Sequence, residues 1–176
     1  MELKTIINSF EIKGSIETIQ KFNKGLINTT YLIKTNREKY IFQRINTSIF
    51  KNVSAIMDNI EMVNTHLKKN NYRYELLAVI KTKSNSNLLF DSTNTPWRCY
   101  TYIEHKNYTF SNLNNKIMEE YGNAIGHFHA CLTNCDTAKI TNTITDFHNT
   151  TKYFTAFKNL MNKSTSKRKN EVEEEL

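Results

Sequence analysis

The sequence is poor in glycine and nearly devoid of proline, with four Gly and one Pro among 176 residues. Each glycine that does appear therefore carries positional information. No apolar run approaches the roughly 18 residues of a membrane-spanning helix, and the N-terminus has no apolar signal-peptide segment. These absences argue against a membrane partner and predict a cytoplasmic protein.

Cysteine is scarce as well, with three residues, an odd number. We expect reduced thiols, as in the cytosol. A candidate set of zinc ligands occurs at helical spacing: His127, Cys131 and Cys135. Ligands spread over two helical turns are too far apart for one tetrahedral ion, so no metal site is predicted.

Positive charge is in excess, with 24 Lys and Arg against 17 Asp and Glu and a formal net charge of +7. The cations are spread along the whole chain, whereas a nucleic-acid site needs a cluster on one face. The densest basic run, 167–169, is followed at once by glutamates, a pattern typical of a solvated helix. We therefore expect no nucleic-acid partner.

Three strand-like runs separated by turn residues open the chain: Ser15–Phe22, Thr29–Lys34 and Lys39–Ile45. Short turns between successive strands predict an antiparallel meander. The first turn contains Gly25, a residue that can adopt positive φ.

The hydrophobic period then changes to that of a helix over 52–69. Leu77–Lys81 and Trp97–Ile103 are two further predicted strands, and Leu88–Phe90 is a possible short one between them. Two helices are expected beyond residue 103, one with Ser111 as its N-cap and one over 149–161. Strands followed by helices alone indicate the α+β class, with a sheet region at 1–103 and a helical region at 104–176.

Several segments, taken in order, resemble the aminoglycoside phosphotransferase and choline kinase family, and within it the bacterial N-acetylhexosamine 1-kinases. They are KGLINTTYLI (24–33), YIFQRIN (40–46), IFKN (49–52), MDNIEMV (57–63), His66-Leu67, Gly122, Gly126, Phe128, His129 and FHNT (147–150). The resemblance implies a protein-kinase-like fold. Its N-lobe, a five-stranded antiparallel sheet plus one helix, would occupy 1–103, and the hinge with the first helices of a truncated C-lobe would occupy 104–176.

The resemblance also implies a nucleotide site, with ATP and Mg²⁺ as cofactors of the full-length family. A turn around Gly25 can bring backbone N–H groups close to phosphate, although an ordinary hairpin turn explains the same residues. Arg44 would form an ion pair with Glu61, and this pair would orient the Arg44 guanidinium toward the phosphates. The alternative is that Glu61 is a solvated surface residue. The residues implied as nucleotide-binding are Lys24, Gly25, Asn28, Thr29, Arg44, Glu61, Ile103, Glu104 and His105.

Other residues compete for parts of these roles. Lys34 and Lys51 are alternative cations for the phosphates. Ile41 and Leu32 can sandwich the base, or they can be plain core residues.

The catalytic segment of this family has no counterpart in the sequence. The pattern H-N/G-D-x-x-x-x-N is absent, and the only aspartates after residue 100 are Asp136 and Asp146, in other contexts. The chain is therefore expected to contain neither catalytic residues nor Mg²⁺ ligands, and to be inactive alone as the N-terminal part of a sugar kinase. A non-catalytic binding module is the alternative; the acceptor, and ATP against GTP, stay open.

Overall fold

The computed structural model describes residues 2–22, 25–163 and 165–171. The chain divides into two compact units, Met1–Thr143 and Ile144–Leu176, and each is described by itself. This division falls later than the lobe boundary expected after residue 103, and that boundary stays a prediction.

Six strands in the first unit form one antiparallel sheet in the order β1-β2-β3-β6-β4, with β5 paired to β6. The predicted meander and the α+β class are confirmed. The sheet has one strand more than the five predicted, because the two residues of β5 pair with β6. The strands are β1 (Ile16–Phe22), β2 (Thr29–Thr35), β3 (Lys39–Arg44), β4 (Val79–Ile80), β5 (Leu89–Phe90) and β6 (Pro96–Thr101).

The helices largely follow the predicted periodicity. Those of the first unit are α1 (Leu3–Asn8), α2 (Val53–Lys69), η1 (Phe110–Asn112), α3 (Asn115–Leu132) and η2 (Thr137–Lys139). The second unit contains α4 (Thr150–Lys163) and α5 (Lys167–Glu171). Helix α1 was not predicted. Ser111 was wrongly assigned as the N-cap of α3: Asn114 is the cap, and its side chain accepts a hydrogen bond from the Ile117 amide.

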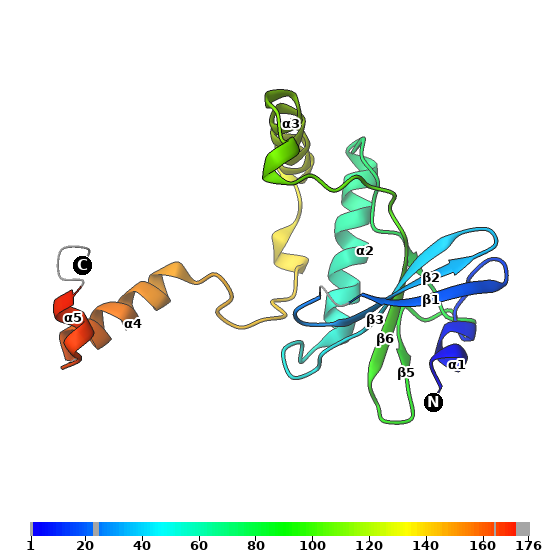
Figure 1. Ribbon diagram of the computed structural model, residues 1–176, viewed down its shortest axis with the longest axis horizontal. Helices are drawn as coiled ribbons and strands as arrows, with labels where there is room; N and C mark the ends of the chain where they lie inside the picture. Colours follow the sequence, from blue (N-terminus) through cyan, green and yellow to red (C-terminus); the bar gives the residue numbers. More distant parts are fainter. Residues whose placement is uncertain (1, 23–24, 164, 172–176) are drawn as a thin grey trace. The chain divides into compact units, whose positions relative to one another are not determined.

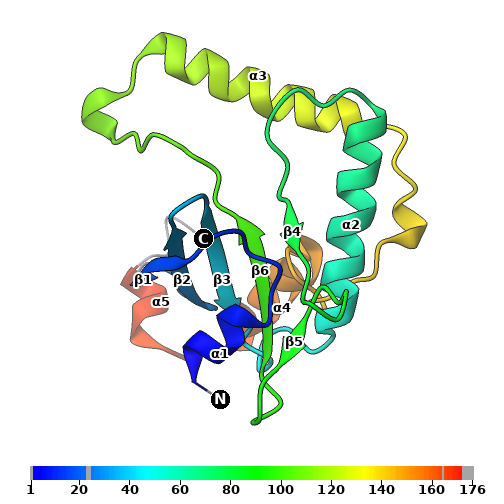
Figure 2. The same ribbon diagram turned by 90° about the vertical axis from the view of Figure 1, so that its right-hand side faces the viewer.

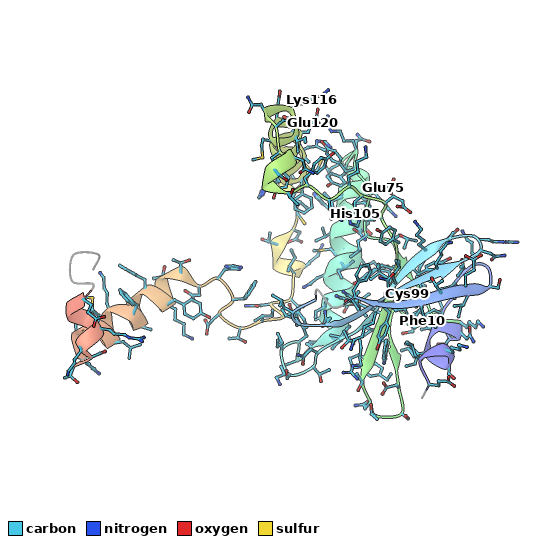
Figure 3. The ribbon with its side chains drawn as sticks, viewed as in Figure 1. Phe10, Glu75, Cys99, His105, Lys116 and Glu120 are labelled. Carbon is cyan, nitrogen blue, oxygen red and sulfur yellow. The ribbon has the colours of Figure 1, made fainter. Side chains whose placement is uncertain are left out.

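One face of the sheet forms the hydrophobic core with α1. Tyr40 and Phe42 on β3 are fully buried, and Phe42 meets Phe10 edge-on with ring centroids 5.2 Å apart. Cys99 of β6 belongs to the same cluster (Figure 3). Burying a large apolar side chain is worth about 1.5–3 kcal/mol. Because side chains alternate along a strand, this burial also decides which residues of β3 face the other way.

The opposite face of the sheet carries Ile41 and Gln43 of β3 and Arg98 of β6. Helix α2 lies on this side, since the Met57 Sδ is 3.9 Å from Arg98 Nη1. Figure 1 accordingly shows α1 and α2 on opposite sides of the sheet, and Figure 2 shows α2 beside β4 and β5.

Positive φ occurs at Gly14, which has φ 87°. A Cβ on Gly14 would lie 2.3 Å from Asn36 Oδ1, the atom that accepts a hydrogen bond from the Ser15 amide. Gly25 instead permits a close approach, since a Cβ there would lie 3.0 Å from the carbonyl oxygen of Asn28.

Across the described residues, none of the helices is both long enough and apolar enough to cross a membrane.

The β5–β6 hairpin is held together by one carboxylate. Asp91 Oδ1 accepts hydrogen bonds from the amides of Thr93 and Thr95 at 2.9 and 3.0 Å, and from the Thr93 hydroxyl at 2.6 Å. Asp91 Oδ2 accepts one from Trp97 Nε1 at 2.9 Å. These donors, the Thr93 hydroxyl first and Trp97 next, hold the pKa of Asp91 well below its ordinary value. The first residues of β6 are thereby fixed.

We predict that Asp91→Ala lowers the free energy of unfolding at pH 7 by about 1–3 kcal/mol, because several donors lose a charged acceptor. The folded-state pKa of Asp91 is depressed. Its contribution to the free energy of unfolding is therefore present above the unfolded-state pKa of about 4, and it disappears as the pH falls toward the folded-state pKa. Urea unfolding at several pH values measures it. Asp58→Ala, on the exposed side of α2, is the matched control. Equal losses in the two variants would contradict the assignment.

Candidate functional site

A cavity of about 500 Å³ lies against the sheet face that carries Ile41 and Gln43. Its floor is formed by these two residues together with Arg98 and Tyr100, their neighbours across the β3–β6 ladder. The remaining wall comes from β1, β2, the segment before β4 and the connector after β6. The wall residues are Phe22, Thr30, Leu77, Thr101, Tyr102, Ile103 and His105.

Hydrogen bonds between side chains fix the polar end of this floor. Arg98 donates from Nε and Nη2 to Gln43 Oε1, at 3.0 and 2.9 Å. Gln43 Nε2 in turn donates to Thr30 Oγ1 at 3.2 Å. The guanidinium is therefore oriented by a neutral amide on the neighbouring strand.

Tyr100 lies beside this guanidinium. The Arg98 Cζ is 5.0 Å from the centroid of the Tyr100 ring, a cation–π distance. Tyr100 is only 3% exposed, and burial raises the pKa of its phenol to about 12 against the opposing effect of the Arg98 charge. Burial likewise lowers the pKa of Arg98 from its ordinary value, yet a guanidinium stays protonated in proteins.

The connector after β6 places its residues on alternate sides. Ile103 and His105, both predicted as site residues, line the cavity. His105 Nδ1 is 2.9 Å from the Ile103 carbonyl oxygen, and so can donate to it. Glu104 lies elsewhere, with its Oε1 2.5 Å from Lys39 Nζ. Two of the three connector residues are therefore together at the cavity.

The predicted turn residues have mainly local roles. Asn28 Oδ1 accepts a hydrogen bond from the Asn46 amide at 3.0 Å, which joins the turn to the end of β3. Thr29 faces Arg44 across the β2–β3 ladder, and both line a second cavity of about 330 Å³. Lys24 falls outside the described residues, and neither Gly25 nor Asn28 lines the larger cavity.

The predicted ion pair between Arg44 and Glu61 is wrong. Arg44 shares the strand face of Tyr40 and Phe42, away from the larger cavity, and its side chain is exposed. Glu61 Oε2 instead accepts a hydrogen bond from Asn87 Nδ2 at 3.4 Å. The prediction failed because it followed the motif and not the pleat, in which Gln43 and not Arg44 faces the cavity.

The alternatives that the sequence offered are also separated by the structure. Lys34, considered as a cation for phosphate, lies 3.2 Å from Glu17 on the neighbouring strand. Ile41 lines the cavity, and Leu32, its partner across the ladder, does not.

Comparison of the fold with solved structures finds a similarity to spectinomycin phosphotransferase APH(9)-Ia, solved in complex with ADP and spectinomycin. The TM-score is 0.51 at 15% sequence identity, and the match covers 72% of this chain and 36% of that one. No protein-family model matches the sequence. The likeness establishes the kind of fold: a kinase-like N-lobe with part of a C-lobe. This chain spans about a third of the phosphotransferase's length.

Magnesium has no evident ligands here. Mg²⁺ is bound through carboxylates and phosphate oxygens. None of the described residues that line the larger cavity is acidic.

Sequence reasoning missed Gln43, Arg98 and Tyr100. Gln43 was within reach, because the aromatic residues Tyr40 and Phe42 already mark the buried parity of β3. Arg98 was not, since its position beside Gln43 depends on how β6 pairs with β3, about 55 residues apart in sequence.

Double-mutant cycles can test which guanidinium is coupled to which partner. We predict a coupling free energy of about 0.5–3 kcal/mol between Arg98→Ala and Gln43→Ala, whose side chains share two hydrogen bonds. Arg44→Ala and Glu61→Ala should be additive within about 0.3–0.5 kcal/mol, because the two side chains lie apart. Urea unfolding of the single and double variants measures both cycles, and each serves as the control for the other. Strong coupling of Arg44 to Glu61 would restore the ion pair rejected above.

Proposed function

We propose that this chain is the nucleotide-binding part of an ATP-dependent small-molecule phosphotransferase, and that the larger cavity accepts the nucleotide. The observation that carries the proposal is the cavity's place, between the α2 face of the sheet and the connector that leaves β6. The fold likeness to a phosphotransferase solved with ADP supports it.

The lining suits a heterocycle with a polar substituent. A volume of about 500 Å³ falls in the range of small-molecule sites. Phe22, Ile41, Leu77 and Ile103 offer apolar surface for a base. At the other end, Arg98 presents a positive charge.

The acceptor proposed from the sequence resemblance is a sugar, an N-acetylhexosamine phosphorylated at its anomeric hydroxyl. Nothing in the cavity selects such an acceptor, so this part rests on the motifs alone. The same holds for Mg²⁺ as a cofactor.

A non-catalytic binding module with this fold is the competing proposal. The absence of the H-N/G-D-x-x-x-x-N segment from the sequence favours this alternative. It predicts a folded chain without affinity for nucleotides, and the two proposals therefore part on one measurement.

We predict that the chain binds ADP, with measurable heat in titration calorimetry, and that Ile41→Trp abolishes the binding. The larger side chain would occupy the cavity floor where the base is expected to lie. Ile140→Trp, at an exposed site that does not line this cavity, is the matched control and should bind as the unmodified chain does. A chain that folds but binds neither adenosine nor ADP would support the non-catalytic module.

We also predict that the 176-residue chain transfers no phosphate from ATP to N-acetylhexosamines, because its sequence lacks the H-N/G-D-x-x-x-x-N segment that supplies the catalytic base in the family it resembles. Following the release of ADP and the formation of sugar phosphate checks this. Turnover by the purified chain, absent when the cavity is blocked by Ile41→Trp, would contradict it.

A further inference from the structure

Arg98 is a cation without an anion. None of the ion pairs found among the described residues involves it, and the described cavity lining contains no carboxylate. Its oriented partner, Gln43, is neutral. Placing a charge in a partly buried site is costly unless an opposite charge meets it. A guanidinium held in this way is suited to an anionic ligand.

The guanidinium also retains unused donors. Nε and Nη2 donate to Gln43 Oε1, whereas Nη1 lies 3.9 Å from the Met57 sulfur. A thioether is a weak acceptor. The Tyr100 hydroxyl is close enough to affect the pKa of Arg98, but the two groups do not meet the geometry of a hydrogen bond. Nη1 is thus left without an oxygen acceptor of good geometry among the described residues, while the Gln43 contact fixes its direction.

A second buried polar group lies at the same place. The Tyr100 hydroxyl has no hydrogen-bond partner of good geometry in the described part of the chain, although the residue is only 3% exposed. Buried hydroxyls are rarely left without a partner, and exceptions often mark a site where a ligand or water supplies it. A guanidinium with a spare Nη1 donor and a phenol without a hydrogen-bond partner therefore lie two residues apart on the same face of one strand.

We propose that Arg98 and Tyr100 form an oxyanion site in the floor of the cavity that binds a phosphate group of the nucleotide. This assignment rests on the proposed function for the identity of the ligand. The Arg98 guanidinium donates a charge-assisted hydrogen bond and the Tyr100 hydroxyl donates a neutral one, and Gln43 acts as the positioning residue. The phosphate-binding cation then comes from β6, and the cavity-facing position of β3 holds the amide that orients it.

Calorimetric titration of the folded chain with ADP, adenosine and inorganic pyrophosphate tests the site. We expect Arg98→Gln to weaken ADP binding about 10- to 100-fold, as befits the loss of a hydrogen bond to a charged group. Tyr100→Phe should weaken it about 2- to 10-fold. Adenosine should bind all variants alike. Arg37→Gln is the matched control, since it removes an exposed guanidinium that does not line the cavity, and it should leave ADP binding unchanged.

The outcomes separate the two proposals. If adenosine and ADP bind but Arg98→Gln has no effect on ADP, the oxyanion site is wrong and the nucleotide cavity stands. If neither nucleoside nor nucleotide binds while pyrophosphate binds in an Arg98-dependent way, the anion site stands and the nucleotide cavity falls. A chain that binds none of the three ligands overturns both.

If Arg98→Gln does not fold, the oxyanion site can still be tested on the unmodified chain. The Nε–Hε resonance of Arg98, assigned by its loss in Arg98→Lys, should shift with ADP and pyrophosphate and stay in place with adenosine. A resonance that responds to none of these anions, or equally to adenosine, rules out the phosphate contact.

Discussion

The alternation of side chains along β3 is the constraint on which the rest of the site depends. Tyr40 and Phe42 are fully buried against α1 and the core face of β6, and their burial fixes the orientation of the strand. Ile41 and Gln43 must then face the cavity, because a shift by one residue would expose both aromatic rings. The hydrophobic effect on one face of the sheet thus decides which polar groups are available on the other.

The ladder between β3 and β6 carries that constraint to the cavity floor. Gln43 lies opposite Arg98 and Ile41 opposite Tyr100, so the floor is built from two cross-strand pairs. The start of β6 is held by Asp91, whose hydrogen bonds to Trp97 and to the turn residues close the β5–β6 hairpin. Asp91 is not among the described residues that line the cavity, yet it helps to fix the strand that carries Arg98 and Tyr100.

The pairing of the Arg98 guanidinium with the neutral Gln43 amide is not the arrangement that would contribute most to stability. A carboxylate opposite Arg98 would satisfy the guanidinium more fully, and an apolar residue would avoid the cost of burial. The pairing with Gln43 orients the cation and leaves its charge available. Together with the unpartnered Tyr100 hydroxyl, it makes one end of the cavity electropositive and ready to donate hydrogen bonds.

The sequence by itself determined the α+β class, the meander of the first three strands and the amphipathic helix α2, because local periodicity and turn residues encode them. The resemblance also pointed to the connector residues Ile103 and His105, which line the cavity. The sequence did not reveal the partners of Arg44 and Glu61 or the Gln43–Arg98–Tyr100 floor, and it offered β5 only as a possible strand. Those depend on the pairing of β6 with strands far away in sequence, and on the face that burial selects, which only the tertiary structure decided.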